Sequence, residues 1–289
     1  MGRFCLVCTC YGLFVPNTSH AMSKINRPMS RGKKLLAAMS RSPQIVCCAR
    51  TFINWLPITR VYGGASLPTG FAARARCGFE LPLRDPADVQ TTWVVFCASD
   101  YFVPDDCKTV LDLGANIGAF TLYAACCRKA QHVYAFEPVA GTFDILQQNI
   151  LANRVANVTL FHKGIAGQSG TRKMHLGVTS QHSSMIYRGS SKYESGVTEE
   201  VEVVSLEQLL DDLAVDQVDM AKMDCEGGEV EVILAASDDT LRRIKHLSIE
   251  YHFPANISNE AEFFGRLARA GFKCRRKSRA GKLAQFVRV

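Results

Sequence analysis

The stretch TVLDLGANIGAF, residues 109–120, constrains the possible folds of this chain more than any other feature. Its first part is a short apolar run that ends at Gly114, which is typical of a buried β-strand closed by a turn. The residues from 119 to 130, AFTLYAACCRKA, have the length and apolar spacing of a helix. A strand, a glycine-rich turn and a helix in this order predict a nucleotide-binding α/β unit.

The alternation of strands and helices continues to the C-terminus. Residues 132–138 and 158–164 are predicted strands, and residues 141–154 between them are a predicted helix. The second half adds helices over 205–213, 229–237 and 259–271, strands over 218–224 and 244–252, and a terminal hairpin of 272–277 with 283–289. This order predicts an α/β fold with a doubly wound, mostly parallel sheet and an antiparallel C-terminal hairpin.

A long insertion, about residues 164–204, separates the two halves of this pattern. It is rich in Gly, Ser and other polar residues and contains only short strand-like runs. Insertions of this length often shape a substrate site, so we expect this one to border the acceptor pocket.

The first ninety residues differ from the rest, with 12 Lys and Arg against 3 Asp and Glu. We expect residues 1–74 to form a basic leader, poorly ordered or partly helical, ahead of a main domain over 75–289. Pro57 in NWLPITR predicts the end of a helix, and Asp85-Pro86 predicts a turn after a short strand in GFELPL. The apolar start of the chain resembles a weak secretory signal but is shorter than the roughly 20 residues that span a bilayer.

The composition excludes a disordered or low-complexity protein, because 47% of the residues are hydrophobic and 21% are charged. Among twelve cysteines, only Cys5, Cys8 and Cys10 lie at ligand-like intervals, and no second Cys or His pair accompanies them. We therefore predict no metal site and a reducing, cytoplasmic location, with an N-terminal signal or membrane-surface leader as the alternative. The last 24 residues hold nine Lys and Arg and no acid, which indicates a solvated face or an anion-binding one.

Residues with binding chemistry fall at the predicted strand ends, where open α/β sheets bind ligands. Asp112 ends the first strand, and Gly114, Asn116 and Gly118 lie in the turn, with the spacing D-x-G-x-x-x-G rather than G-x-G-x-x-G. Missing side chains in that turn let a ligand approach the backbone. Glu137, at the end of the second strand, is placed to bind both ribose hydroxyls of an adenosine group, with a carboxylate at a helix N-terminus as the structural alternative.

Four segments in register resemble a known family. VLDLGANIGAF, VYAFEP, VEVVSLEQLL and AKMDCEGGE are similar, in order and spacing, to the FkbM family of S-adenosylmethionine-dependent methyltransferases. The similarity runs from about residue 105 to about residue 270 and does not cover the leader. It implies a Rossmann-like, seven-stranded sheet that binds S-adenosylmethionine and transfers its methyl group, in known members usually to an oxygen of a sugar, polyketide or similar small molecule.

The resemblance also implies roles for individual residues. Gly114, Asn116 and Gly118 would contact the amino-acid end of the cofactor, Glu137 would bind its ribose, and Asp112 would brace the loop. Asp224 and Glu226 fall on the family's Lys-Ile-Asp-x-Glu-Gly segment. Two departures stand out: Gly228 occupies a position where the family usually has a larger residue, which would loosen the helix start, and HKGIAG after the third strand lacks a carboxylate for the adenine amino group.

Methyl transfer to a hydroxyl requires a base, because a neutral alcohol is a poor nucleophile. The candidates are Asp224, Glu226 and His252, all at the carboxyl ends of predicted strands, although a lone histidine there is more often a packing or hydrogen-bonding residue. Strand alternation places Asp224 and Glu226 on one side if the strand continues that far, with Cys225 pointing into the core. The same rule places Glu250, which needs a partner for its charge, on the side of His252.

Three other readings stay open at this point. A nicotinamide dehydrogenase shares the strand, the glycine turn and the distant acid but lacks G-x-G-x-x-G. A nucleic-acid methyltransferase fits the basic ends, but no Asn-Pro-Pro-aromatic segment is present at the fourth strand. A methyltransferase-like domain that only binds ligands is the third. We expect a small-molecule acceptor rather than nucleic acid and no transmembrane segment; the sequence does not indicate the oligomeric state.

Overall fold

The computed structural model describes residues 43–98, 101–179, 183–185, 194–253, 260–277 and 283–289. The apolar start of the chain therefore lies outside the described residues. The described residues fall into two compact units, the first over 43–98 and the second from residue 101 onward. No helix in the described ranges has the length and apolar character that a membrane span requires.

The described part of the first unit combines helices with a small hairpin. A helix over residues 43–51 precedes α2 (Trp55–Tyr62), and β1 (Ala72–Arg74) pairs antiparallel with β2 (Glu80–Pro82) ahead of α3 (Pro86–Phe96). Residue 75, where the sequence placed the start of the main domain, lies between these two paired strands.

Two local predictions for the first unit are wrong. Pro57 lies in the first turn of α2 rather than at a helix end, because N–H groups of the first turn have no helical acceptor to lose. Asp85-Pro86 begins α3 instead of forming a turn. Asp85 caps this helix by accepting the Asp88 N–H at 3.0 Å, and Pro86 takes the first helical position.

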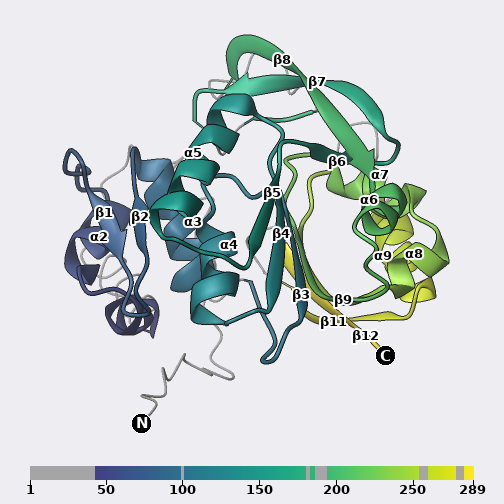
Figure 1. The fold of residues 1–289 in the computed structure, drawn as a ribbon, viewed down its shortest axis with the longest axis horizontal. Coiled ribbons are helices and arrows are strands. Elements are labelled where there is room, and N and C mark those ends of the chain that lie inside the picture. Colours follow the sequence, from purple (N-terminus) through teal and green to yellow (C-terminus); the bar gives the residue numbers. More distant parts are fainter. Residues whose placement is uncertain (1–42, 99–100, 180–182, 186–193, 254–259, 278–282) are drawn as a thin grey trace, which may run out of the picture. The chain divides into compact units, whose positions relative to one another are not determined.

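The second unit is built on a seven-stranded sheet with the order β11-β12-β10-β9-β3-β4-β5 (Figure 1). Its strands are β3 (Thr109–Leu113), β4 (His132–Phe136), β5 (Val158–Phe161), β9 (Val218–Met223), β10 (Ile244–Glu250), β11 (Phe272–Lys277) and β12 (Leu283–Arg288). The five strands from β10 to β5 pair in parallel, whereas β12 pairs antiparallel with β10 and β11. The predicted doubly wound, mostly parallel sheet with a C-terminal antiparallel hairpin is confirmed.

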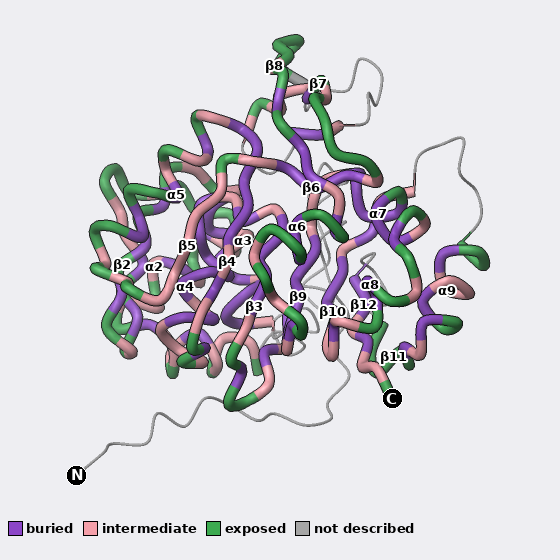
Figure 2. The backbone as a smooth tube through the Cα atoms, turned by 45° about the vertical axis from the view of Figure 1, so that its right-hand side comes forward, coloured by how far each residue is buried: buried purple, intermediate pink, exposed green. Residues whose placement is uncertain are grey.

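Helices cover both faces of this sheet. Figure 1 shows α4 (Ala119–Leu122) and α5 (Ala140–Ala152) on one face, and α6 (Leu206–Asp212), α7 (Glu229–Ala235), α8 (Asp238–Arg242) and α9 (Glu260–Arg269) on the other. A π-helical turn, η2 (Tyr123–Cys127), continues α4. Figure 2 shows the central strands coloured mainly as buried, and four of the five residues of β3 are buried. Burial on two faces explains the near-continuous apolar runs that predicted these strands.

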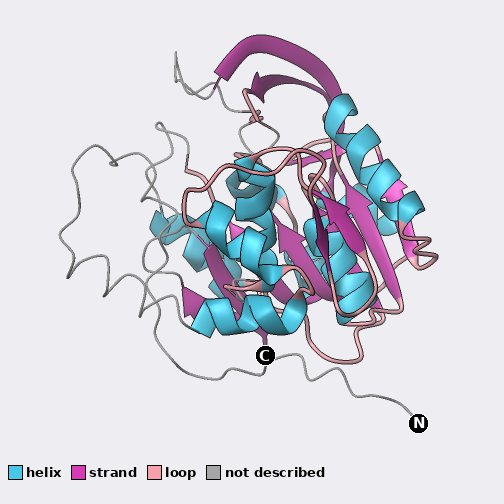
Figure 3. Cartoon of the chain, turned by 90° about the vertical axis from the view of Figure 1, so that its left-hand side faces the viewer, coloured by secondary structure: helices cyan, strands magenta, loops and turns pink. Residues whose placement is uncertain are grey.

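The insertion folds as a second, smaller sheet. Its strands β6 (Gly164–Ala166), β7 (Gly170–Gly177) and β8 (Glu194–Ser205) form three strands in the order β6-β8-β7. Figures 1 and 3 show β7 and β8 extending away from the seven-stranded sheet. Because β6 follows the carboxyl end of β5, the insertion starts at the edge of the sheet where the predicted site residues lie.

Candidate active site

Buried charges hold the loop after β3. Asp112 is fully buried, accepts a hydrogen bond from the Thr121 hydroxyl at 2.5 Å and lies 3.2 Å from the Lys222 ammonium. Lys222 also donates to the Gly114 carbonyl oxygen. Burial disfavours the charged amine, but the Asp112 and Asp224 carboxylates outweigh burial and raise the pKa of Lys222 above its ordinary value. A charged, buried lysine therefore ties the end of β9 to the turn after β3.

Two glycines of this turn leave no space for a side chain. Gly114 has φ of 81°, and a Cβ there would lie 1.9 Å from the Asp224 carbonyl oxygen. Gly118 has φ of 89°, and a Cβ would lie 2.7 Å from Leu146 Cδ1 in α5. The left-handed region strongly favours glycine. The backbone after β3 thus passes directly against the backbone after β9, so the two predicted halves of the site are neighbours.

Glu137 follows β4 and is held by the same turn. Its Oε2 accepts the Asn116 N–H at 2.9 Å, and its Oε1 accepts the Val139 N–H at 3.0 Å. Asn116 adopts φ of 51°, and its side chain accepts the Ile117 N–H at 2.7 Å. Burial raises the pKa of Glu137 to about 7, although both N–H groups favour the ionised form. Each carboxylate oxygen retains capacity for a second hydrogen bond.

A second group of polar residues follows β9 and β10. The Asp224 N–H donates to the Leu113 carbonyl at 3.0 Å, and its Oδ2 accepts the Tyr101 hydroxyl at 3.1 Å. The same hydroxyl lies 3.4 Å from Oε2 of Glu250, the last residue of β10. Asp224 Oδ1 is buried and has no hydrogen-bond partner within the described structure. Burial and the Asp224 charge raise the pKa of Glu250 to about 8, against the opposing effect of His252.

The predicted strand alternation of Asp224 and Glu226 is wrong. β9 ends before Asp224, and the chain turns through Glu226 at φ of 50° and Gly227 at φ of 121°. Glu229, at the start of α7, holds this turn: its Oε1 accepts the Cys225 N–H at 2.7 Å, and its Oε2 accepts the Gly227 N–H at 3.0 Å. These bonds take the backbone donors that a longer strand would have paired. Cys225 does pack against the hydrophobic core, as expected.

His252 lies between two carboxylates. Its Nδ1 is 3.3 Å from Glu229 Oε1, and its Nε2 is 3.8 Å from Glu226 Oε2. Burial disfavours the imidazolium, but the hydrogen bond to Glu229 and the charges of both glutamates outweigh burial and raise the pKa of His252 to about 9. The ring is therefore charged at neutral pH, when it has no free lone pair to accept a proton. This geometry favours His252 as a counter-cation and disfavours it as a base.

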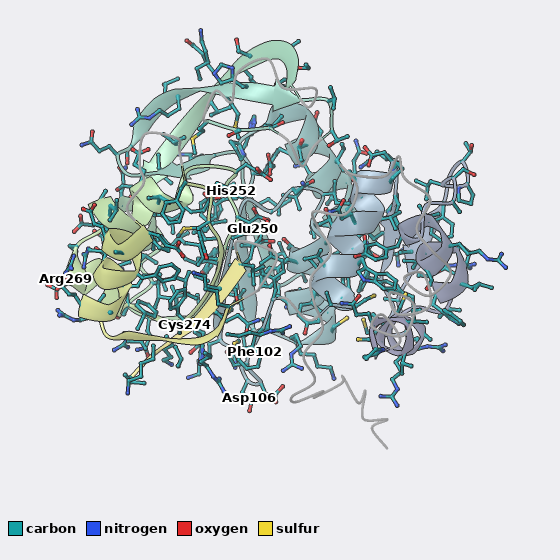
Figure 4. All side chains as sticks on the ribbon, turned by 180° about the vertical axis from the view of Figure 1, so that it is seen from behind. Phe102, Asp106, Glu250, His252, Arg269 and Cys274 are labelled. Carbon is teal, nitrogen blue, oxygen red and sulfur yellow. The ribbon has the colours of Figure 1, made fainter. Side chains whose placement is uncertain are left out.

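Strand alternation does not align Glu250 with His252, because β10 ends at Glu250 and His252 lies beyond the strand. Figure 4 labels both residues at that end of the strand, and the His252 charge acts to lower the pKa of Glu250. The turn beyond the strand, rather than its pleat, brings His252 to the site.

Asp224, Glu229 and His252 are the described residues with the spacing of a possible metal site, since their ligand atoms lie within 4.8 Å of one another. Glu229 also accepts backbone N–H groups through both oxygens and lies 3.3 Å from the His252 ring. Within the described structure, Glu226, Glu229 and His252 thus form an ion-pair cluster.

Gly228 is the N-cap residue of α7 and lies against the insertion. A Cβ at this position would lie 2.6 Å from Met185 Cε and 3.0 Å from the Ile165 carbonyl oxygen. The absence of a side chain lets the insertion pack closely on the helix start. The departure from the family pattern therefore accompanies a close contact between α7 and the insertion.

Three residues of the site carried no assigned role in the sequence reasoning: Tyr101, Lys222 and Glu229. Lys222 left a usable signal, because a lysine inside the apolar strand VDMAKM needs a buried partner. Glu229 left a weaker one as an acid at a helix start. Tyr101 left none, since its partners Asp224 and Glu250 are 123 and 149 residues away along the chain.

Comparison with known proteins decides the family. The model of the methyltransferase FkbM domain matches residues 112–274, more than half of the chain. The chain belongs to the FkbM methyltransferase family. The FkbM match starts at Asp112 and ends in β11, so it includes the glycine turn, Glu137 and the acids after β9 and β10.

The curated proteins that the chain resembles are distant in sequence. The chain is 23% identical over 180 residues to methyltransferase sdnD of Sordaria araneosa, covering 53% of this chain and 70% of that protein. It is 27% identical over 142 residues to hexuronic acid methyltransferase AglP of Haloferax volcanii, covering 49% and 54%. It is 25% identical over 171 residues to 31-O-demethyl-FK506 methyltransferase FkbM of Streptomyces tacrolimicus, covering 50% and 65%. The chain therefore covers less than two thirds of the length of the latter two proteins.

Proposed function

We propose that this FkbM-family chain transfers a methyl group from S-adenosylmethionine to a hydroxyl oxygen of a small molecule. The observation that carries the proposal is the close approach of the Gly114 backbone to Asp224, which joins the glycine turn to the acids after β9. This junction lies between β3 and β9, where the chain order of the strands reverses. Ligands of open α/β sheets bind at such a position.

The residues after β3 and β4 fit the cofactor. Gly114 and Gly118 present backbone without side chains, and Glu137 is a buried carboxylate held beside them, as a ribose-binding acid would need to be. Asp224 Oδ1, buried without a partner, suits the positive charge of a sulfonium. When bound, S-adenosylmethionine supplies an electrophilic methyl group. Asp112 and Lys222 would not contact the cofactor themselves, because their role is to hold the turn after β3 in place.

The chain's other contribution is to hold the acceptor and remove its proton. Asp224, Glu226 and Glu250 face this part of the site with one imidazolium, His252, so an acceptor that donates hydrogen bonds is favoured over an anionic one. The name of one relative refers to a 31-O-demethyl compound, which supports transfer to an oxygen of a small molecule. The name of another refers to a hexuronic acid, which is anionic, so the test includes uronic acids beside neutral sugars. Nucleic acid and a purely binding role remain as outcomes of the test below.

Cofactor binding is tested by calorimetry with S-adenosylmethionine and its demethylated product. We expect both to bind, and Glu137→Gln to weaken each by about 10- to 100-fold, because a charged acceptor of ribose hydroxyls is lost. Glu207→Gln, an exposed carboxylate in α6, is the matched control and should bind as the wild type does. The absence of heat with either ligand in the wild type would refute the proposal.

Methyl transfer is tested with labelled S-adenosylmethionine and a panel of neutral sugars, uronic acids, hydroxylated polyketides and RNA. Asp224→Asn should abolish transfer while the circular dichroism spectrum stays unchanged, with Asp144→Asn on the exposed face of α5 as the control. Full activity of Asp224→Asn would refute its assignment. Labelling of RNA alone would favour the nucleic-acid alternative, and binding without transfer to any compound would favour the binding module.

A further inference from the structure

We infer that Glu250 is the group that takes the proton from the acceptor hydroxyl, and that Tyr101 is the positioning residue that holds it beside Asp224. The inference rests on the proposed methyl transfer and specifies its proton acceptor. It differs from the sequence-based choice of Asp224, Glu226 or His252, because the tertiary contacts of these groups suit other tasks.

Strand register places Glu250 at the centre of the site. β10 and β9 pair in parallel with Ile249 opposite Met223, so the next residues, Glu250 at the end of β10 and Asp224 just beyond β9, lie side by side. The Tyr101 hydroxyl spans the two, at 3.1 Å from Asp224 and 3.4 Å from Glu250. A single hydroxyl proton serves one oxygen at a time, so its shorter contact leaves Glu250 less well bonded than Asp224.

Three other titratable groups that face Glu250 are already engaged. Glu229 bonds two backbone N–H groups and His252, and Glu226 pairs with the His252 ring at 3.8 Å. His252 is charged at neutral pH and lacks a free lone pair. The backbone carbonyl of Asp224 lies against Gly114, and its unpartnered Oδ1 is the oxygen proposed above to face the sulfonium. Because β10 lies on the far side of β9 from β3, Glu250 is the acid farther from the cofactor loop.

Electrostatics support this role. Burial and the Asp224 charge raise the pKa of Glu250 to about 8, so its ionised form binds a proton more tightly than an ordinary glutamate does. A base is most effective when its pKa lies near the working pH. Tyr101 is itself fixed, being 4% exposed, with its ring 5.7 Å from the Phe120 ring and 5.9 Å from the Lys222 ammonium. A fixed hydroxyl can hold Glu250 in one position.

The step balances in atoms and electrons. A lone pair of the acceptor oxygen forms the bond to the methyl carbon, and the electron pair of the methyl–sulfur bond stays on sulfur, which becomes a neutral thioether. The O–H bond of the acceptor breaks, its electron pair stays on oxygen, and the proton binds to the Glu250 carboxylate. Release of that proton to water restores Glu250.

The decisive experiment is a pH–rate profile at saturating S-adenosylmethionine, with the acceptor found in the screen. We expect the wild-type kcat to rise about tenfold per pH unit and to level off near the Glu250 pKa of about 8. Glu250→Gln should lose about 10²- to 10⁴-fold in kcat together with this pH dependence, while Glu207→Gln keeps both. Formate should restore part of the rate of Glu250→Ala. Tyr101→Phe should move the rise to higher pH, because a donor to the carboxylates is lost.

A second readout needs no activity. The infrared carbonyl band of a protonated carboxyl group should disappear as pH rises through about 8 in the wild type and be missing from Glu250→Gln. Wild-type kcat in Glu250→Gln, an unchanged pH profile, or no band that depends on Glu250 would overturn the inference. Loss of S-adenosylmethionine binding in Glu250→Gln would also overturn it, since Glu250 would then hold the cofactor. Failure of the wild type to bind S-adenosylmethionine would instead refute the proposed function.

Discussion

Replacing Gly114 by alanine tests whether the turn after β3 and the turn after β9 are in contact. The added Cβ would lie 1.9 Å from the Asp224 carbonyl oxygen, whereas real Cβ atoms essentially never come within 3.0 Å of such an atom. The two backbones would therefore have to separate by about 1 Å, since neither atom is at the end of a flexible side chain. That movement would strain the bond from the Asp224 N–H to the Leu113 carbonyl, now 3.0 Å long.

The expected cost follows from these two effects. A left-handed φ of 81° disfavours alanine by about 1–2 kcal/mol, and a weakened buried hydrogen bond adds about 1–3 kcal/mol. We expect Gly114→Ala to lower the free energy of unfolding by about 3 kcal/mol and to weaken S-adenosylmethionine binding. Gly118→Ala should cost less, because the atom at 2.7 Å is the end of the Leu146 side chain, which can move.

The assay is urea unfolding followed by circular dichroism, with the change read from the midpoint at constant slope. Gly141→Ala is the matched control, because this glycine in the first turn of α5 has no atom within 4 Å of an added Cβ. It should leave stability unchanged or raise it by up to about 1 kcal/mol. If Gly114→Ala unfolds within about 0.5 kcal/mol of the control, the close approach of the two turns is wrong.

Three further predictions concern buried charge. Lys222→Met should lower the free energy of unfolding by about 3–5 kcal/mol, because it leaves Asp112 buried and without its cation. Adding Asp112→Asn should recover part of this loss, and additive losses in a double-mutant cycle would contradict the pairing. Folding raises the pKa of His252 from 6.5 to about 9, so the stability that its charge contributes is complete below pH 6.5 and is lost as pH rises through about 9. Replacing His252 by Gln should therefore reduce the fall in the free energy of unfolding over this range by up to about 3 kcal/mol. Equal pH slopes for the wild type and His252→Gln would speak against the ion-pair cluster. Folding raises the pKa of Glu250 from 4.5 to about 8, so between these pH values the folded state keeps a proton that the unfolded state releases, and stability falls as pH rises. Urea unfolding at pH 8 should therefore show Glu250→Gln to be more stable than the wild type. A less stable Glu250→Gln would contradict the assigned burial of this carboxyl group.

Local patterns were enough to place most elements of the second unit. The apolar runs of β3, β4 and β9 are visible because strands buried on two faces carry few polar residues. Where prediction failed, the signal was ambiguous. Pro57 and Asp85-Pro86 begin helices because proline is compatible with the first turn of a helix as well as with a chain break.

The candidate site divides in the same way. Asp112, Gly114 and Glu137 could be singled out from the sequence, because each lies at a strand end that the chain pattern locates. The turn at Glu226 could not, since it depends on the Glu229 carboxylate binding backbone N–H groups of the preceding loop. The pattern of residue types therefore identified where ligand chemistry belongs but not how its groups are paired.

By itself, the sequence determined the order of strands and helices, the family, and which acids lie at strand ends, because these properties depend on neighbouring residues. The tertiary structure alone decided that β3 lies between β4 and β9, that Asp224 touches the turn at Gly114, and that Tyr101 spans Asp224 and Glu250. Those contacts join residues more than a hundred positions apart. Burial and the charge of Asp224, rather than residue type, then raise the proton affinity of Glu250 above that of an ordinary glutamate.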